Sequence, residues 1–311
     1  MAQLKISETQ RTKGVILALL STLSFSFMMI FAALNSPEIS LWEQTFFRNL
    51  IGIFVASFIL IKNHQPLFGE RKYWPQMFAR SLFGLLAVML LLTLCACGKG
   101  AAPDVTPRNA LQADVSIMNR ISMFTISIVS VVFLHERLTK MHIPAMLIAF
   151  TGAYIAANPR FDSAFLPLLA AFCTSLCDAV CYPLLSYFSG RVNAYSVVMF
   201  FCTFSTIVSG ICMIPTFVVP SGPDLFYLIM IGVTAALGQI LMTLSYHYAP
   251  AGELSIYNLM GILFSALLGF FILHQIPTVR TFIGGGLVVL ASLLLFFYKK
   301  RWLKTNDSSA G

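Results

Sequence analysis

The sequence predicts an all-α integral membrane protein with ten transmembrane helices, arranged as two inverted five-helix repeats. Three observations predict this fold class: an apolar composition, ten apolar segments, and an internal match between residues 113–139 and 252–278. Of the 311 residues, 58% are hydrophobic and only 10% are charged. A soluble domain has about 25% charged residues, so we expect most of this chain to face lipid or other helices.

The apolar segments have the length and pattern of membrane-spanning helices. Such a helix needs about 20 apolar residues. The strands of a transmembrane barrel would alternate apolar and polar residues, whereas residues 15–34 and 284–298 are apolar on every side. Cutting at charges, Pro and Gly gives the segments 14–34, 41–61, 77–97, 112–133, 141–157, 165–187, 194–214, 225–246, 253–273 and 279–298. The loops between them are too short for a soluble domain.

The distribution of basic residues predicts the orientation. With the N-terminus in the cytoplasm, 13 of the 20 Lys and Arg residues lie on the cytoplasmic side and four lie on the other side. Positive residues collect in cytoplasmic loops, so we expect both termini in the cytoplasm. The remaining three, Arg48, Arg80 and Arg120, fall inside predicted helices.

The internal match defines the repeat unit. It aligns the fourth segment with the ninth without a gap, and Asp114 faces Glu253 in this alignment. The identical pairs are Ser116/Ser255, Ile117/Ile256, Asn119/Asn258, Leu134/Leu273, His135/His274 and Thr139/Thr278. A unit of five helices is odd, so the second unit enters the membrane in the opposite orientation. The predicted units are residues 1–157 and 158–311. The first unit has extra residues at 98–108, either a tolerated outer loop or a lid.

These residues carry a family resemblance. The phrases FFRNLIGIF (46–54), LHERLT (134–139) and IGGGLVVLAS (283–292), together with residues 235–270, resemble the EamA-like ten-helix permeases of the drug/metabolite transporter superfamily. The resemblance implies a multi-pass carrier of the inner (plasma) membrane for amino acids, drugs or other metabolites, with a central cavity lined by both repeats. Two departures are the 98–108 insertion and Gln275, where the family often has Glu.

Two charged residues inside apolar helices are the first candidates for substrate binding. A charge at the centre of a membrane helix costs about 2.5–3.5 kcal/mol, so such residues face a wet cavity or a partner. Arg120 follows Ser116 by one turn and could bind a carboxylate, or it could pair with Asp178 or Asp114. Asp178 could bind substrate or carry a proton, or it could pair with Arg120 or Arg48.

Neutral polar residues complete the predicted site. Gln239, Tyr257 and Asn258 supply hydrogen-bonding groups in the eighth and ninth segments, and Asn119 matches Asn258 in the first repeat. The two Asn residues could touch substrate or join the halves. Arg48 is expected to pair with Glu43 or to reach the outer headgroups.

The leading hypothesis is a secondary transporter for a small organic metabolite or drug, amino-acid-like compounds included, that works by alternating access. The alternatives are a polytopic membrane enzyme acting on a lipid-linked substrate and a non-transporting partner subunit. No nucleotide-binding motif, cofactor site or metal-ligand spacing is found in the sequence, and no nucleic-acid partner is expected. We expect a monomer or homodimer in contact with membrane lipid. The substrate, the direction of transport and coupling to a proton or another ion stay open.

Overall fold

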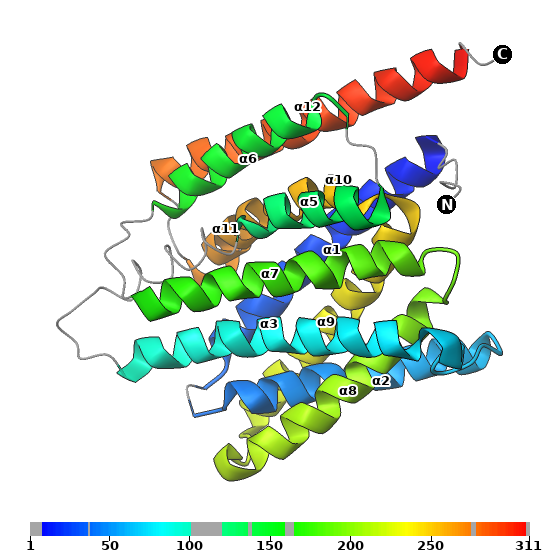
Figure 1. The fold of residues 1–311 in the computed structure, drawn as a ribbon. Coiled ribbons are helices and arrows are strands. Elements are labelled where there is room, and N and C mark those ends of the chain that lie inside the picture. The colour runs from blue at the N-terminus through cyan, green and yellow to red at the C-terminus, as the bar shows by residue number, and fades with distance from the viewer. Residues whose placement is uncertain are drawn as a thin grey trace.

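The computed structural model describes residues 8–36, 38–100, 120–135, 139–158, 165–274 and 278–308. Within these residues the chain is helical and contains no β-strand. Figure 1 shows the helices running along one common direction as a single bundle. The α-helices of the first part are α1 (Glu8–Leu34), α2 (Leu41–Lys62), α3 (Trp74–Gly100), α5 (Ser122–Leu134) and α6 (His142–Ala157). Those of the second part are α7 (Phe165–Phe188), α8 (Ala194–Met213), α9 (Gly222–Tyr248), α10 (Ala251–Tyr257), α11 (Gly261–Leu273) and α12 (Val279–Ser308).

Short polar signals at the segment boundaries set the helix starts. The Ser40 hydroxyl accepts a hydrogen bond from the backbone N–H of Glu43 at the start of α2. Asn193 caps α8 in the same way, and Ser221 caps α9 directly before Gly222. A side-chain oxygen at this position satisfies a backbone N–H that has no partner inside the helix. The predicted segments lie on observed helices, except that 253–273 is divided into α10 and α11 by a 3-10 turn and that residues 112–119 of the fourth segment are outside the described residues.

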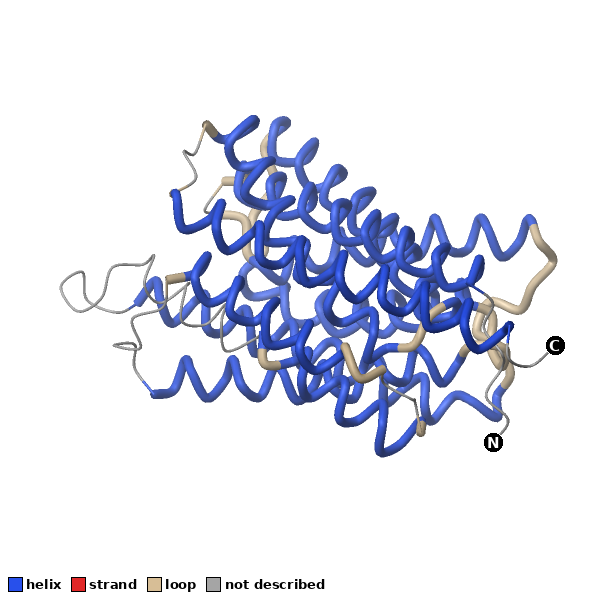
Figure 2. The backbone as a smooth tube through the Cα atoms, turned by 90° about the horizontal axis from the view of Figure 1, so that it is seen from above, coloured by secondary structure: helices blue, strands red, loops and turns tan. Residues whose placement is uncertain are grey.

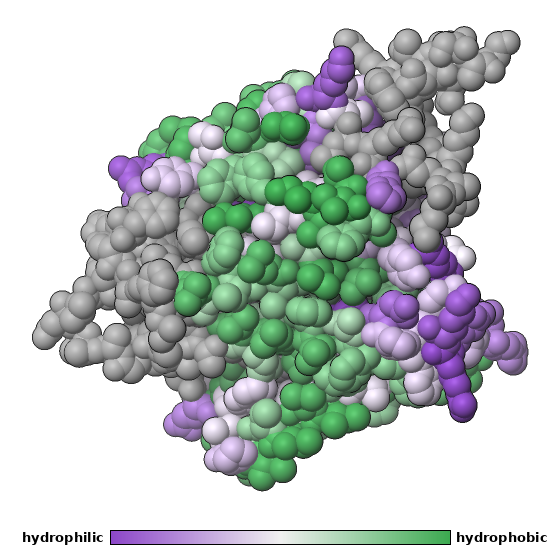
Figure 3. Space-filling view, in the orientation of Figure 1, coloured by the Kyte–Doolittle hydropathy of each residue, from purple (hydrophilic) through white to green (hydrophobic). Residues whose placement is uncertain are grey.

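The outer surface of the bundle suits a lipid environment. Among the described residues, seven helices are long and apolar enough to cross a membrane, and residues 122–134 and 142–157 form shorter apolar helices. Figure 3 shows apolar side chains over the middle of the bundle and hydrophilic ones toward its ends. Phe54, Phe133 and Val279 are 66%, 75% and 74% exposed, although water would penalise such a surface. The protein is a multi-pass membrane protein.

The closest helix neighbours are far apart in the sequence. α1 packs along α9, α3 along α7, α2 along α8 and α6 along α12. Seen from above in Figure 2, both termini lie at the same end of the bundle. The start of α3, preceded by the short 3-10 helix Arg71–Tyr73, lies at this end too (Figure 1).

The helices α5 and α11, which carry the described part of the internal match, both follow a turn and end in the same way. α10 and α11 are separated by a 3-10 turn, Asn258–Met260, and a turn at Ile121 precedes α5. α5 and α11 both contain 13 residues. They end before His135 and His274, whose φ angles of 52° and 54° place both in the left-handed region. The sequence match is thus accompanied by a match in local conformation.

Glycines bring α6 and α12 into close contact. A Cβ added at Gly284 would lie 2.3 Å from the carbonyl oxygen of Gly152, and a Cβ at Gly152 would lie 2.6 Å from the carbonyl oxygen of Gly284. Small residues let membrane helices approach through their backbones. By contrast, a Cβ at Gly286 would meet no atom within 4 Å.

Candidate functional site

The interior of the bundle contains a polar cluster around Tyr182 of α7. Asp178 lies one turn before Tyr182 on the same helix. The Tyr182 ring stacks on Tyr246 of α9, with ring centroids 5.6 Å apart and planes 21° apart. The side-chain amide of Asn258 donates a hydrogen bond to the Tyr246 hydroxyl over 3.2 Å. The predicted residues Asp178 and Asn258 thus belong to one connected group.

Arg120 reaches this cluster from the break before α5. It lies within electrostatic range of both Asp178 and Tyr182. The Arg120 Nε atom is buried without a hydrogen-bond acceptor, and in the described part of the chain no Arg120 nitrogen lies within 4.0 Å of an Asp178 oxygen. The two opposite charges therefore interact electrostatically without forming a direct ion pair. Asp114, the other partner considered for Arg120, is outside the described residues.

Two further arginines lie within electrostatic range of Tyr182, and neither was predicted from the sequence to belong to the site. Arg48 of α2 and Arg80 of α3 lie within electrostatic range of Tyr182, and Arg48 within that of Arg80. The signal that could have found them was already present, because both interrupt apolar runs. We define Arg48, Arg80, Arg120, Asp178 and Tyr182 as the central cluster.

The expected position of Arg48 is wrong. The structure shows no ion pair between Arg48 and Glu43. A Glu43 carboxylate oxygen instead accepts a hydrogen bond from the backbone N–H of Val218 over 3.4 Å. Arg48 points inward, because the helix face that carries it packs against α8 and α9.

Gln239 lies beside Arg48 in a narrow cavity. The side chain of Gln239 is 4% exposed, and its Nε2 atom has no hydrogen-bond acceptor among the described residues. The cavity has a volume of about 10 Å³, which is room for about one water molecule. Its walls are formed by Arg48, Asn49, Phe201, Cys202, Ala235, Ala236 and Gln239.

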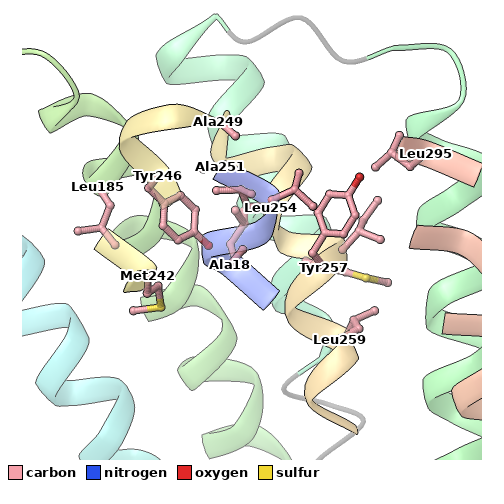
Figure 4. Close-up of a cluster of buried hydrophobic side chains, with 14 of the residues drawn as sticks. Ala18, Leu185, Met242, Tyr246, Ala249, Ala251, Leu254, Tyr257, Leu259 and Leu295 are labelled. Atoms are coloured by element: carbon pink, nitrogen blue, oxygen red, sulfur yellow. The ribbon is translucent and has the colours of Figure 1, made fainter. Parts of the chain in front are cut away.

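Tyr257 and Asn258 are adjacent in the sequence but take part in different groups. Figure 4 shows Tyr257 on the side of Leu295, whereas Tyr246, the partner of Asn258, lies on the side of Leu185. The Tyr257 hydroxyl is buried without a hydrogen-bond partner and lies within electrostatic range of Glu253. Tyr257 therefore belongs with a second charged group, the one around Glu253 at the end of the bundle.

This second group, the end cluster, consists of Glu253, Arg11 and Lys299. Glu253 is 1% exposed at the start of α10. The Arg11 Nε atom lies 2.7 and 2.9 Å from the two carboxylate oxygens, and Lys299 donates to the same carboxylate. In the sequence, Arg11 and Lys299 counted as basic residues of the cytoplasmic side. In the structure they are buried partners of one carboxylate and join both ends of the chain to α10.

Some sequence predictions fall outside what the structure describes. Asn119 and residues 101–108 of the insertion are outside the described residues, so their predicted roles stay predictions. Within the described residues no group of three His, Cys, Asp or Glu side chains is placed to hold a metal ion.

The comparison with known families identifies the class of protein. The EamA-like transporter family matches residues 12–158 and 165–297, so the chain belongs to this family. The resemblance seen in the sequence is confirmed. The chain is therefore a membrane transporter of small molecules and not an enzyme.

Individual relatives are also transporters. A pseudopaline exporter of Pseudomonas aeruginosa is 26% identical over 289 residues, which cover 92% of this chain and 97% of the relative. An S-adenosylmethionine uptake transporter of Rickettsia bellii is 22% identical and covers 91% of this chain and 93% of its own length. A solved crystal structure with 17% identity covers 94% of this chain and 99% of its own, with a TM-score of 0.76. At this identity the solved structure is evidence for the fold alone.

Proposed function

We propose that this protein is a secondary carrier that moves a small organic anion or zwitterion across the inner membrane by alternating access. The observation that supports this best is the pair Arg120 and Asp178. They lie within electrostatic range of each other inside an apolar bundle, and no Arg120 nitrogen is within 4.0 Å of an Asp178 oxygen. A carboxylate bound at Arg120 and an amino group bound at Asp178 would satisfy both.

Alternating access requires two halves that can rock about the site, and we assign these to residues 1–157 and 158–311. The contacts between helices support this assignment, because they recur when each helix is replaced by its counterpart in the other half. The counterparts are α1 and α7, α2 and α8, α3 and α9, and α6 and α12. The α1–α9 contact then becomes α7–α3, and the α2–α9 contact becomes α8–α3. The α2–α8 and α6–α12 contacts are preserved. Five helices in each half give an inverted repeat with ten spans.

We place both termini in the cytoplasm. The excess of Lys and Arg on that side supports this orientation. The position of both termini at one end of the bundle agrees with an even number of spans (Figure 1).

The substrate-binding residues that we propose are Arg120, Asn119, Asp178, Gln239, Tyr257 and Asn258. The contacts support Arg120, Asp178 and Asn258 most directly, since these meet through Tyr182 and Tyr246. The direction of transport is not decided by the relatives, because one is named as an exporter and others as uptake transporters. The alternative of an enzyme acting on lipid-linked substrates is not retained, because the family and the named relatives are transporters.

The test has two stages. A comparison of metabolites in cells that lack and cells that overproduce the protein identifies the compound class, and flux of that compound is then measured in proteoliposomes. Arg120→Lys keeps the charge and loses the bidentate fork, so we expect normal membrane levels and an apparent KM raised on the order of tenfold. The matched control is Arg280→Lys, because Arg280 is exposed.

Asp178→Asn is the second variant and should also weaken transport. Unchanged kinetics in well-folded Arg120→Lys and Asp178→Asn would remove both residues from the site.

A further inference from the structure

The charges around Tyr182 do not balance. Arg48, Arg80 and Arg120 supply three positive charges, and Asp178 supplies one negative charge. Among the described residues, two of these positive charges therefore have no counter-charge in the interior of the bundle. Such charges are costly there unless a partner or a water-filled path compensates them.

Arg80 is the most deeply buried of the three. Only 2% of its surface is exposed, and both Nε and Nη1 are buried without a hydrogen-bond acceptor in the part of the chain that the structure describes. Its guanidinium group lies over the ring of Phe201, 4.0 Å from the ring centroid. The aromatic face attracts the cation but provides no acceptor for its N–H groups. Arg80 is thus held in place by packing while part of its hydrogen-bonding capacity is unused.

The same Phe201 ring connects Arg80 to the cavity at Gln239. Phe201 is a wall of that cavity, together with Arg48 and Gln239. Gln239 contributes a second buried nitrogen without an acceptor. The groups of Arg80 and Gln239 that lack an acceptor are hydrogen-bond donors. Of the three residues Arg80, Arg48 and Gln239, two are cations. A group of acceptors with negative charge, an oxyanion, is the ligand that would satisfy them.

We propose that Arg80, Arg48 and Gln239 form a second oxyanion subsite next to the Arg120–Asp178 site, closed in this structure to about the volume of one water molecule, so that the transported compound carries two acidic groups. This inference rests on the proposed function and makes its substrate class specific. One acidic group binds at Arg120 and the second binds at Arg80. Two acidic groups together with Asp178 balance the three arginines when the compound carries no amino group, whose positive charge would add to theirs. Carboxylate and phosphate groups share the chemistry that this subsite requires.

The first test uses stability and does not depend on knowing the substrate. In the substrate-free protein Arg80 is an uncompensated buried charge, so Arg80→Met should raise the thermal unfolding midpoint in detergent and abolish transport. Sodium sulfate and sodium phosphate, compared with sodium chloride at equal ionic strength, should stabilise the wild type and the exposed control Arg280→Met more than Arg80→Met. The proposal would be overturned if Arg80→Met had a lower midpoint than the wild type and if sulfate and phosphate stabilised both proteins equally.

The second test uses transport kinetics. Arg80→Lys keeps the charge without the planar fork, and we expect an apparent KM raised on the order of tenfold at normal membrane levels. The compound found by the metabolite comparison should carry at least two acidic groups, and its monoamide should be transported poorly by the wild type. Its chemistry distinguishes a carboxylate from a phosphate as the second group.

The outcomes separate this inference from the proposed function. If Arg120→Lys weakens transport while Arg80→Lys does not, or if the compound has one acidic group, the second subsite is refuted and the proposed site stands. A compound without any acidic group refutes both. If neither variant changes transport, both assignments fail.

Discussion

Replacing Glu253 by Gln should destabilise this protein more than any other single change in the end cluster. Glu253, Arg11 and Lys299 are 1%, 5% and 8% exposed, so water cannot compensate a lost charge. The carboxylate accepts both hydrogen bonds of the Arg11 Nε–H, at 2.7 and 2.9 Å, and a further bond from Lys299. Glu253→Gln keeps the shape and leaves two cations facing each other.

The magnitude follows from the geometry. Removing one partner of a buried ion pair costs about 3–5 kcal/mol, because the other charge stays buried without compensation. For a chain of a few hundred residues this is on the order of a 10 °C decrease in the unfolding midpoint. Lys299→Gln should cost less, about 1–3 kcal/mol, because the Arg11–Glu253 pair remains. Arg11→Gln should fall between the two, since Arg11 makes the bidentate contact.

The assay is thermal unfolding of the purified protein in detergent. The fraction of protein that remains monodisperse is measured at each temperature. Glu70→Gln is the matched control, because Glu70 is exposed and the same charge is removed. We expect the wild-type midpoint for the control and the order Glu253→Gln, Arg11→Gln, Lys299→Gln for decreasing damage. Equal midpoints for Glu253→Gln and Glu70→Gln would refute the reasoning.

Two other predictions concern packing and topology. Gly284→Ala should lower stability by about 1–3 kcal/mol through overpacking against α6, whereas Gly286→Ala should be neutral; equal effects in an unfolding assay would contradict the close contact. Single Cys residues, placed in a background without native Cys, should react with a membrane-impermeant reagent in intact cells within 98–108 and not within 62–76. Labelling of 62–76 alone would reverse the orientation.

The sequence was sufficient for most of the helix segments and for two of the central charges, Arg120 and Asp178. Runs of apolar residues indicate spans directly, because the bilayer requires about 20 of them. In the structure, the caps Ser40 and Asn193 fix where α2 and α8 begin. Arg120 and Asp178 could be assigned to the interior because a charge in an apolar helix needs a reason. The gapless match did not predict the turns at Ile121 and Asn258–Met260, because residues 112–133 and 253–273 were each expected to form one helix.

Only the tertiary structure decided which helix faces meet. It placed Arg48 beside Gln239 and not in an ion pair with Glu43, and it brought Arg11 and Lys299 to one carboxylate from opposite ends of the chain. In a soluble helix the apolar stripe shows which face is packed. Here lipid is as apolar as the protein interior, so hydrophobicity is nearly equal on every face and carries no such information. The packed faces are chosen by close fit and by polar contacts between distant segments, which exist only once the chain has folded.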